Sequence, residues 1–380
     1  MLAVYSERFS GYDTFQEEFL KGMQQQEGFN LHVIVEEYPT KEVRKEEKGG
    51  ISYIYIPQIG ENRFEVLEFY LGSAIESNAK MVFLSNFFPA IFNVKAIKNL
   101  FPHARLIHVV HDFPWLSRFM GNEKKYMDYI QNGREYLLST QDERFIRYCT
   151  YDIIESFKSI DMIISLCEST YRMLTDFYGI SPKKIRLIRN GMADYMVHHK
   201  ADEYQHIRLK YNLPLSETLV LLVGRLTRSK GADRISTLLN CINSLAKWRL
   251  VYAGPDDIYK WIPTPMVDLV VPLGFRNRQE MLEIYSAVDL GLLPSRHEQC
   301  SYSGIEFLMY DIPVIVTPAY GVQDMFHTGN AIVIFNAHQQ ITTEEIETKK
   351  GWARDSYLKN YTNEKMNRQY VSLITKLTTI

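Results

Sequence analysis

The amino-acid sequence predicts an α/β protein built from two doubly wound parallel sheets. Short runs rich in Val, Ile and Leu alternate with amphipathic stretches of helical length, and this alternation occurs in both halves of the chain. The chain has 380 residues. Since a single hydrophobic core stops growing at roughly 250 to 300 residues, we expect two domains, with a ligand bound where the strands end.

Composition narrows the class of protein. A net charge of -2 gives no general attraction to nucleic acid, and the four cysteines form no C-x-x-C pair that would indicate a disulfide framework or a zinc site. Apolar runs are all shorter than the roughly 18 residues of a membrane span, and the first residues do not resemble a secretory signal. We therefore expect a cytoplasmic protein, which could associate peripherally with the inner face of the membrane.

The first half reads as strand and helix in alternation. Phe15, Phe19, Leu20 and Met23 share one face of a helix expected within 14–26. Between residues 117 and 158 a polar and aromatic region fits one or two helices. Apolar, β-rich runs predict strands at 2–5, 30–37, 51–58, 80–87, 105–113, 159–166 and 185–189.

The second half repeats this pattern after a polar helix and loop at 201–217. We expect domains at 1–195 and 196–350, and a helix at 351–380 that returns to the first domain. Strands are expected at 218–226, 248–254, 266–274, 289–295, 313–318 and 331–335, and helices at 232–246, 277–288 and 304–311.

Arg225 and Lys230 lie in the loop "VGRLTRSKG", between a strand that ends at Gly224 and a helix that follows Gly231. Arginine offers phosphate a planar pair of donors and lysine a mobile charge, so together they could stabilise a departing diphosphate. A solvated basic loop before a helix is the alternative interpretation, and the local sequence alone favours neither.

Glu298 and Glu306 flank a loop that joins a predicted strand to a predicted helix. Ser301, Ser303 and Gly304 fall in the first turn of that helix, where unpaired N–H groups and the helix dipole attract an anion. Carboxylates accept hydrogen bonds from sugar hydroxyls, so with a nucleotide sugar Glu306 could bind the ribose and Glu298 the donor sugar. A simple interaction with the helix dipole is the alternative for Glu306, but it does not explain Glu298.

Five motifs, in the same order as in the family, make the second half similar to retaining glycosyltransferases of the GT-B fold, specifically family 4. The resemblance covers roughly residues 180 to 325. The motifs are "KKIRLIRNGM", "VGRLTRSKG", "YAGP", "LGFRNRQEMLEIYSAVDLGLLPS" and the E-x7-E pair of Glu298 and Glu306. The resemblance implies two Rossmann-like domains that face each other across a cleft.

The resemblance also implies how a nucleotide-diphosphate sugar is held. UDP-sugars are favoured, GDP-sugars are the alternative, and the second domain carries most of the contacts. Arg225 and Lys230 would bind the diphosphate, Glu306 the ribose and Glu298 the transferred sugar. The base would lie near Leu273, Gly274 and Phe275, and the donor-binding set also includes Gly224, Ser301, Tyr302, Ser303 and Gly304.

In the first domain "HVVHDFP" matches the family's strand that ends in histidine, which makes His111 the candidate for a contact beside the reacting carbon, oriented by Asp112. A structural histidine is the alternative. Gly11 stands where the family has a glycine-rich loop. Asn190 and Gly191 match the family's Asn-Gly, where we favour a structural turn over a catalytic role.

The sequence contains no Asp-x-Asp, so we expect no essential metal and no cofactor. For this family, retention implies front-face attack, in which the acceptor hydroxyl gives its proton to the departing phosphate and catalysis rests on orientation and charge. Closure of the two domains would exclude water. The acceptor would be a glycan, a lipid-linked glycan or a protein, with cell-surface glycan synthesis favoured.

Three other functions are compatible with parts of the sequence. A nucleotide-sugar epimerase could share the fold, but the E-x7-E loop argues for transfer. A glycosidase needs two carboxylates close to the scissile bond, whereas the cationic loop argues for a phosphate leaving group. A non-catalytic partner subunit would be expected to have lost Arg225, Lys230 or Glu298, and all three are present.

Overall fold

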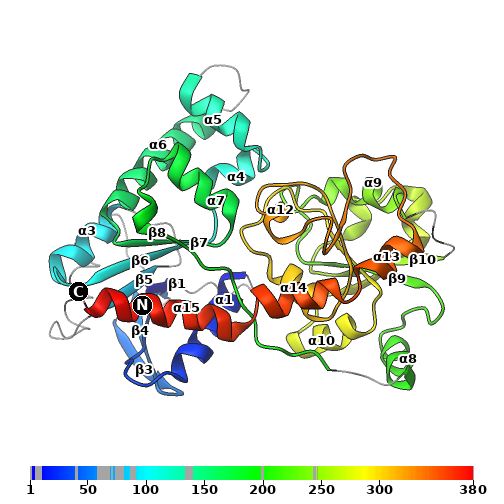
Figure 1. Cartoon of the computed structure of the whole chain (residues 1–380), viewed down its shortest axis with the longest axis horizontal. Coiled ribbons are helices and arrows are strands. Elements are labelled where there is room, and N and C mark those ends of the chain that lie inside the picture. Colours follow the sequence, from blue (N-terminus) through cyan, green and yellow to red (C-terminus); the bar gives the residue numbers. More distant parts are fainter. Residues whose placement is uncertain are drawn as a thin grey trace. The chain divides into compact units, whose positions relative to one another are not determined.

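The computed structural model describes residues 2–4, 11–38, 42–57, 69, 72, 81–85, 91–132, 140–197, 201–242, 245 and 247–379. By the contacts among its residues, the chain divides into two compact units, each with its own sheet (Figure 1). Unit 1 consists of Met1–Pro114, Lys124–Gly191 and Asn363–Ile380, and unit 2 of Trp115–Glu123 and Met192–Thr362. The predicted α/β class, with a mainly parallel sheet in each half, is confirmed.

The sheet of unit 1 has eight strands in the order β3-β4-β2-β1-β5-β6-β7-β8. All neighbours are parallel except β3, which runs antiparallel to β4 at the edge of the sheet and was not predicted. Its sequence RKEEK is charged throughout, which discourages another strand from pairing with this edge. The bounds are β1 Leu2–Val4, β2 His32–Tyr38, β3 Arg44–Lys48, β4 Ile51–Pro57, β5 Val82–Ser85, β6 Arg105–Val110, β7 Met162–Ser165 and β8 Ile185–Leu187.

Helices of unit 1 bury the apolar faces that the sequence predicted. The expected face of the first helix is buried throughout, as are Met366 and Tyr370 near the other end of the chain. Between residues 117 and 158, where one or two helices were expected, the described residues form two complete helices, at 123–132 and 140–159. The helices are α1 Gly11–Gln24, α3 Ile91–Leu100, α5 Glu123–Asn132, α6 Thr140–Ser159, α7 Glu168–Arg172 and α15 Asn363–Thr379. Helix α4, Pro114–Arg118, follows β6, but all of it except Pro114 belongs to unit 2.

Helix α15 lies against α1, at the opposite end of the chain (Figure 1). The Asn363 side-chain amide donates to the backbone carbonyl of Glu18 at 2.7 Å and to its carboxylate at 2.8 Å, both in the buried interior. The helices approach so closely that a Cβ on Gly22 would fall 1.9 Å from Nδ2 of Asn367. A larger residue at position 22 would therefore displace the Asn367 side chain.

Unit 2 is built on a six-stranded, wholly parallel sheet in the order β11-β10-β9-β12-β13-β14. Its strands are β9 Thr218–Val223, β10 Trp248–Ala253, β11 Val270–Gly274, β12 Leu290–Leu293, β13 Val314–Val316 and β14 Ile332–Val333. The helices are α8 Ala201–Lys210, α9 Ile235–Asn240, α10 Arg278–Ser286, α11 Tyr302–Met309, α12 Val322–Met325, α13 Thr343–Lys349 and α14 Trp352–Asn360. Since β9 and β12 are neighbours at the centre of the sheet, the loops that follow them emerge side by side.

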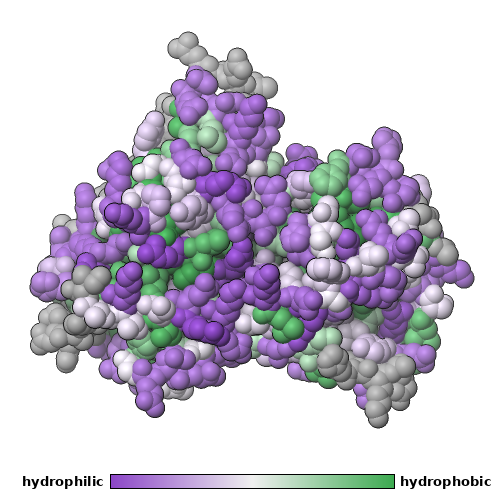
Figure 2. Space-filling view, in the orientation of Figure 1, coloured by the Kyte–Doolittle hydropathy of each residue, from purple (hydrophilic) through white to green (hydrophobic). Residues whose placement is uncertain are grey.

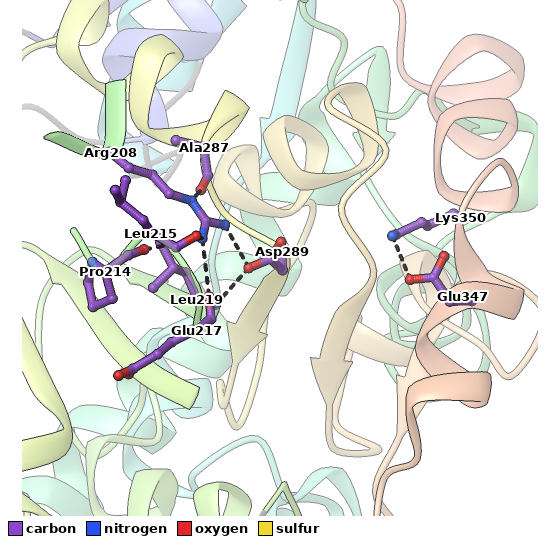
Figure 3. Close-up of polar contacts among 9 residues, drawn as sticks. All are labelled: Arg208, Pro214, Leu215, Glu217, Leu219, Ala287, Asp289, Glu347 and Lys350. Carbon is purple, nitrogen blue, oxygen red and sulfur yellow. Dashed lines mark hydrogen bonds and ion pairs between the residues drawn. The ribbon is translucent and has the colours of Figure 1, made fainter. Parts of the chain in front are cut away.

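At the amino end of this sheet, Arg208 binds several loops together (Figure 3). Its guanidinium group donates to Asp289 Oδ2 at 2.9 Å, and the same oxygen accepts from the backbone N–H of Leu219 at 2.7 Å. It also donates to the backbone carbonyls of Pro214, Leu215, Glu217 and Ala287. This cluster fixes the starts of β9 and β12 and so contributes to the placement of the loops at their other ends.

The predicted single helix at 351–380 is two helices, because the chain bends at Tyr361 and Thr362 between α14 and α15. Helix α14 belongs to unit 2 and α15 to unit 1. The units begin and end at residues other than those expected, and the division at 195/196 and 350/351 stays a prediction.

The face of the molecule in Figure 2 is mostly hydrophilic, with small hydrophobic areas scattered over it. In the part of the chain that the structure describes, no helix is both long and apolar enough to cross a membrane. Cys167, Cys241 and Cys300 are buried thiols that form no disulfide with a described residue.

Candidate functional site

Three glycines line the carboxyl edge of the unit 2 sheet. Gly224 follows β9 with a φ of +103°, Gly254 follows β10, and Gly274 ends β11 with a φ of +71°. The backbone N–H of Gly254 donates to the carbonyl of Gly274 at 3.0 Å, and a Cβ on Gly254 would lie 2.3 Å from the carbonyl of Gly224. A Cβ on Gly224 or Gly274 would meet open space. A ligand can therefore approach the backbone closely at these two positions.

The loop that follows Gly224 is held by two residues that the sequence analysis missed. Asp256 accepts a 2.6 Å hydrogen bond from the backbone N–H of Leu226, and its own N–H donates to the Tyr252 hydroxyl. That hydroxyl donates in turn to the carbonyl of Gly224 at 3.0 Å. Burial raises the pKa of Tyr252 to about 12, so the hydroxyl stays protonated.

Lys230, in the same loop, forms an ion pair with Glu298, which follows β12. Its Nζ lies 2.7 Å from Oε1 of Glu298, and the Ser295 hydroxyl donates to the same oxygen at 2.7 Å. The lysine side chain is 41% exposed and the glutamate side chain only 10%. Burial alone would raise the pKa of Glu298, but the charge of Lys230 and the hydrogen bonds from Lys230 and Ser295 hold this pKa below its ordinary value. Glu298 is therefore ionised at neutral pH.

The second carboxylate oxygen of Glu298 is available to a ligand. Both side-chain interactions described above use Oε1, and no described residue donates a hydrogen bond to Oε2. An ionised carboxylate with one oxygen fixed and the other open is suited to accept a hydrogen bond from a hydroxyl group.

The loops that carry Lys230 and Glu298 are joined through their backbones. The N–H of Arg296 donates to the carbonyl of Ser229 at 2.9 Å, and the Arg296 guanidinium group pairs with Asp233. A Cβ on Gly231 would fall 1.9 Å from the carbonyl of Pro294, and Gly231 has a φ of +73°. Only glycine fits this position. The distance between Lys230 and Glu298 is thus set by rigid backbone contacts as well as by charge.

Helix α11 begins at Tyr302, two residues before the predicted 304, and Ser303 and Gly304 lie in its first turn as expected. Ser301 is its N-cap, since the Ser301 hydroxyl accepts from the backbone N–H of Gly304 at 3.2 Å and lies 3.0 Å from the Ser303 hydroxyl. Tyr302, the first helical residue, is buried. A Cβ on Gly304 would lie 3.1 Å from the ring of Phe326, so this glycine permits a packing contact inside the unit.

Glu306 is one turn into α11 and has partners different from those of Glu298. The Tyr285 hydroxyl, from α10, donates to its Oε2 at 2.6 Å. Burial and the negative charge of Glu306 hold the pKa of Tyr285 well above its ordinary value, so this hydroxyl remains a donor. The hydrogen bond fixes the Glu306 carboxylate at one oxygen.

Other predicted donor contacts are exposed. Arg225 projects into solvent directly after Gly224, and it forms no ion pair with any described residue. Phe275, which follows the edge strand β11, has 57% of its surface exposed, and Leu273 is partly buried. The structure therefore brings Lys230 and Glu298 into contact but not Arg225, whose role stays a prediction.

In unit 1, His111 follows β6, and its ring lies against Phe15 of α1 with centroids 4.8 Å apart. Burial lowers the pKa of His111 to about 3, so its imidazole is neutral at pH 7. Asp112 accepts a 2.8 Å hydrogen bond from the N–H of Phe113. Gly11 begins α1, and residues 5–10 before it lie outside the described residues.

The predicted Asn190–Gly191 turn is wrong. The chain continues from β8 without a turn, Asn190 is buried, and the N–H of Gly191 points to the sulfur of Met366 in α15, 3.1 Å away. This tertiary contact replaces the local turn that Asn-Gly commonly forms.

The missed site residues have partners far away in the sequence. Tyr285 is 21 residues from Glu306, and Asp256 is 30 residues from Leu226. The one missed residue with a local signal is Ser295, three positions before Glu298. A serine there could have been proposed as a support for the carboxylate.

Two family models match the chain. Residues 10–193 match the model described as Glycosyltransferase Family 4, and residues 203–364 match the model described as Glycosyl transferases group 1. An uncharacterised glycosyltransferase of Methanocaldococcus jannaschii is 24% identical over 244 residues, which are 60% of this chain and 62% of that protein. A D-inositol 3-phosphate glycosyltransferase of Corynebacterium aurimucosum is 23% identical over 255 residues, 60% of each chain. The chain thus covers about three fifths of the length of these curated relatives.

Solved structures share the fold over the full chain. Sucrose-phosphate synthase from Thermosynechococcus elongatus superposes with a TM-score of 0.73 at 16% identity, covering 100% of this chain and 99% of that one. HepE from Anabaena, solved in complex with UDP-glucose, has a TM-score of 0.71 at 13% identity, covering 99% of both chains. At these identities the likeness shows the fold alone.

Proposed function

Because the chain belongs to glycosyltransferase family 4 and has the GT-B fold, we propose that it transfers a sugar, with retention, from a nucleotide-diphosphate sugar to an acceptor hydroxyl. The observation that carries the proposal is the 2.7 Å contact between Lys230 and Glu298. It supplies, at one edge of a parallel sheet, a cation for a diphosphate and an ionised acceptor for a sugar hydroxyl.

In this proposal the diphosphate lies over Gly224, where a side chain would otherwise stand. Lys230 is exposed enough to reach a phosphate oxygen while it stays beside Glu298. Arg225, which makes no ion pair among the described residues, adds a second cation from solvent. The α11 N-terminus, with Ser303 near its first N–H groups, adds a favourable dipole.

Transfer then requires no general base from the protein. The bond from the anomeric carbon to the diphosphate oxygen breaks, the acceptor oxygen bonds to that carbon from the same face, and the acceptor proton passes to the departing phosphate oxygen. Glu298 holds a donor hydroxyl through Oε2 and keeps no proton to give, because its pKa is lowered. A glycosidase acid needs the opposite, a carboxyl with a raised pKa.

Specificity for the nucleotide follows from the neighbouring residues. Glu306, fixed by Tyr285, takes the ribose hydroxyls, and the base lies by Leu273, Gly274 and Phe275 at β11. We propose UDP as the first candidate, which the UDP-glucose complex of HepE supports by analogy of fold. His111, neutral and able to donate or accept a hydrogen bond, would contact the donor sugar from unit 1.

The acceptor is proposed to be a hydroxyl of a cell-surface glycan or its lipid-linked precursor. No divalent metal is required in this proposal, because Lys230, Arg225 and backbone N–H groups meet the charge of the leaving group. Activity that survives excess EDTA would agree with this, and activity lost to EDTA and restored by Mg²⁺ or Mn²⁺ would contradict it.

The decisive experiment is thermal unfolding in the presence of UDP, GDP, ADP and TDP, each free and as its glucose ester. A ligand at 100 times its Kd stabilises the folded state by about 2.7 kcal/mol, so a true donor gives a clear shift in Tm. The best donor is then incubated with and without acceptors, and the anomeric configuration of the product is read by NMR. If no nucleotide sugar shifts Tm, or if the donor sugar is epimerised without an acceptor, the proposal fails.

A further inference from the structure

One short segment, residues 115–123, contacts a unit different from that of its neighbours in sequence. The chain before Trp115 and after Glu123 belongs to unit 1, yet the 115–123 segment belongs to unit 2. Nothing in the proposed transfer reaction uses it. Its contacts in unit 2 are with the loop that carries Glu298 and with the residue that anchors that loop.

The segment has a fixed local conformation. Helix α4 begins at Pro114, whose ring suits the first helical position. It ends where the N–H of Gly121 donates to the carbonyl of Leu116 at 2.8 Å and that of Met120 to Ser117 at 3.4 Å. Met120 and Gly121 have φ values of +49° and +71°, the left-handed conformation that ends a helix in this way. The backbone conformation of the segment is therefore fixed by its own local hydrogen bonds.

Gly121 forms the first contact with the loop that carries Glu298, residues 294–301, which we call the carboxylate loop. A Cβ on Gly121 would lie 2.2 Å from the carbonyl oxygen of Arg296 and 3.0 Å from Cβ of His297. Arg296 is two residues before Glu298, and its own N–H is bonded to Ser229. The backbone at Arg296 is thus held between the 115–123 segment and the loop of Lys230.

Trp115 forms the second contact. Its ring meets the ring of Tyr320 edge-on, with centroids 5.3 Å apart and planes at 86°, and both side chains are buried. The carbonyl of Tyr320 accepts a 2.9 Å hydrogen bond from the N–H of Glu298. Trp115 therefore packs against the residue whose backbone holds Glu298.

We propose that the 115–123 segment positions Glu298 for the donor. It supports the carboxylate loop at Arg296 through Gly121 and at Glu298 through Trp115 and Tyr320, on a loop that Gly231 already contacts at Pro294. Trp115 and Gly121 are positioning residues, since they act through Glu298. The inference rests on the proposed function in taking Glu298 as a donor contact.

The test uses Gly121→Ala with Gly179→Ala as its matched control. Gly179 has a similar φ of +66°, and a Cβ there meets nothing within 4 Å, so both variants carry the backbone strain but only Gly121→Ala pushes on Arg296. We expect the donor Kd of Gly121→Ala to rise about tenfold or more, because misplacement of a positioned group by about 1 Å can cost about 100-fold. The donor Kd of Gly179→Ala should stay within about twofold of wild type, with the acceptor KM unchanged in both.

A second readout needs no donor. Cys300 lies in the carboxylate loop and is 6% exposed, so its alkylation, followed by peptide mass spectrometry, reports the position of the loop. Gly121→Ala and Trp115→Leu should accelerate alkylation of Cys300. Gly179→Ala should not, and Trp115→Phe, which keeps an aromatic ring against Tyr320, should restore both the slow alkylation and the donor affinity.

The outcomes separate the two proposals. If wild type binds no nucleotide sugar while Cys300 responds as expected, the proposed function is overturned. If wild type binds a donor but Gly121→Ala matches Gly179→Ala in donor Kd and in Cys300 alkylation, the positioning role is overturned and the proposed function stands. Should Gly121→Ala fail to fold, the comparison of Trp115→Leu with Trp115→Phe decides by the same two measurements.

Discussion

Lys230 Nζ lies 2.7 Å from Glu298 Oε1, although 68 residues separate them in the sequence. The fold creates this contact because β9 and β12 are adjacent, so the loops that follow them meet at one sheet edge. The pair combines a mobile exposed cation with a nearly buried anion. That asymmetry allows the lysine to turn to a diphosphate while the carboxylate remains in place.

Replacing Lys230 with alanine should abolish most sugar transfer without unfolding the protein. The variant removes the cation that meets the charge of the leaving group, and losses of about 100-fold or more in kcat are typical for such groups. Kinetics with the best donor measure the loss, and circular dichroism checks the fold. Lys260→Ala, whose side chain is 76% exposed in unit 2, serves as the control. Turnover close to wild type in Lys230→Ala would contradict the role.

Glu306 should discriminate ribose from deoxyribose. Wild type should bind the ribonucleotide donor more tightly than its 2′,3′-dideoxy analogue, and Glu306→Gln should lose most of that preference. A hydrogen bond to a charged group corresponds to about 10- to 100-fold in affinity. Tyr285→Phe, which removes the 2.6 Å bond that fixes the carboxylate, should fall between the two proteins. Calorimetric titration gives the Kd values, and equal preference in wild type and Glu306→Gln would rule the contact out.

The stability of the protein should fall in mild acid because of two histidines in unit 1, His108, which is buried, and His111, which is half-buried. Burial lowers the pKa values of His108 and His111 to about 3, below the ordinary 6.5. Between these values the unfolded chain binds protons that the folded state cannot, so stability is complete above pH 6.5 and is lost as pH decreases toward 3. Each histidine contributes a slope of about 1.4 kcal/mol per pH unit.

The variant His108→Gln should reduce that slope by the share of one histidine. Urea unfolding followed at several values between pH 4 and 8 measures it, and the carboxylates, which are common to both proteins, cancel in the comparison. His338→Gln, an exposed position, is the control. Parallel curves for wild type and His108→Gln would show that burial of this histidine is not coupled to folding.

Arg208 should be far more important for stability than an exposed ion pair. Its side chain is 13% exposed and bonds to Asp289 and to four backbone carbonyls (Figure 3). Arg208→Met should lower the free energy of unfolding by about 2 kcal/mol, because the Asp289 carboxylate and several part-buried carbonyls lose a charged donor. Lys350→Met, which breaks the exposed pair with Glu347, should change it by less than about 1 kcal/mol. Similar losses in the two variants would contradict the structural role of Arg208.

The parallel strands could be predicted because buried strands are nearly continuous apolar runs. The strand from Thr218 to Val223, TLVLLV, is buried along its centre and was found directly. Strand β3 could not be found, because RKEEK lacks any strand-like composition and is a strand only through its pairing with β4. The Asn190–Gly191 turn failed for a related reason, since a contact with a distant helix overrides the local preference.

In the site, the charged residues could be predicted from the sequence, but the residues that hold them in position could not. Lys230 and Glu298 lie in short motifs whose charges have no obvious structural use, and the structure brings them together. Tyr285 and Trp115 look like ordinary core aromatics in the sequence. Their contacts depend on which loops are neighbours at a sheet edge, and this is known only once both strand order and register are fixed.

The packing of α15 against α1 has a consequence during translation of the chain. Asn363 bonds to Glu18 across 345 residues of sequence. At typical ribosomal speeds of about 5 to 20 residues per second, the emerging chain waits roughly 17 to 70 seconds before this partner exists. During that interval Tyr370 cannot yet pack on Phe15 and Phe19. The nascent chain therefore exposes an apolar helix surface, which a chaperone could bind.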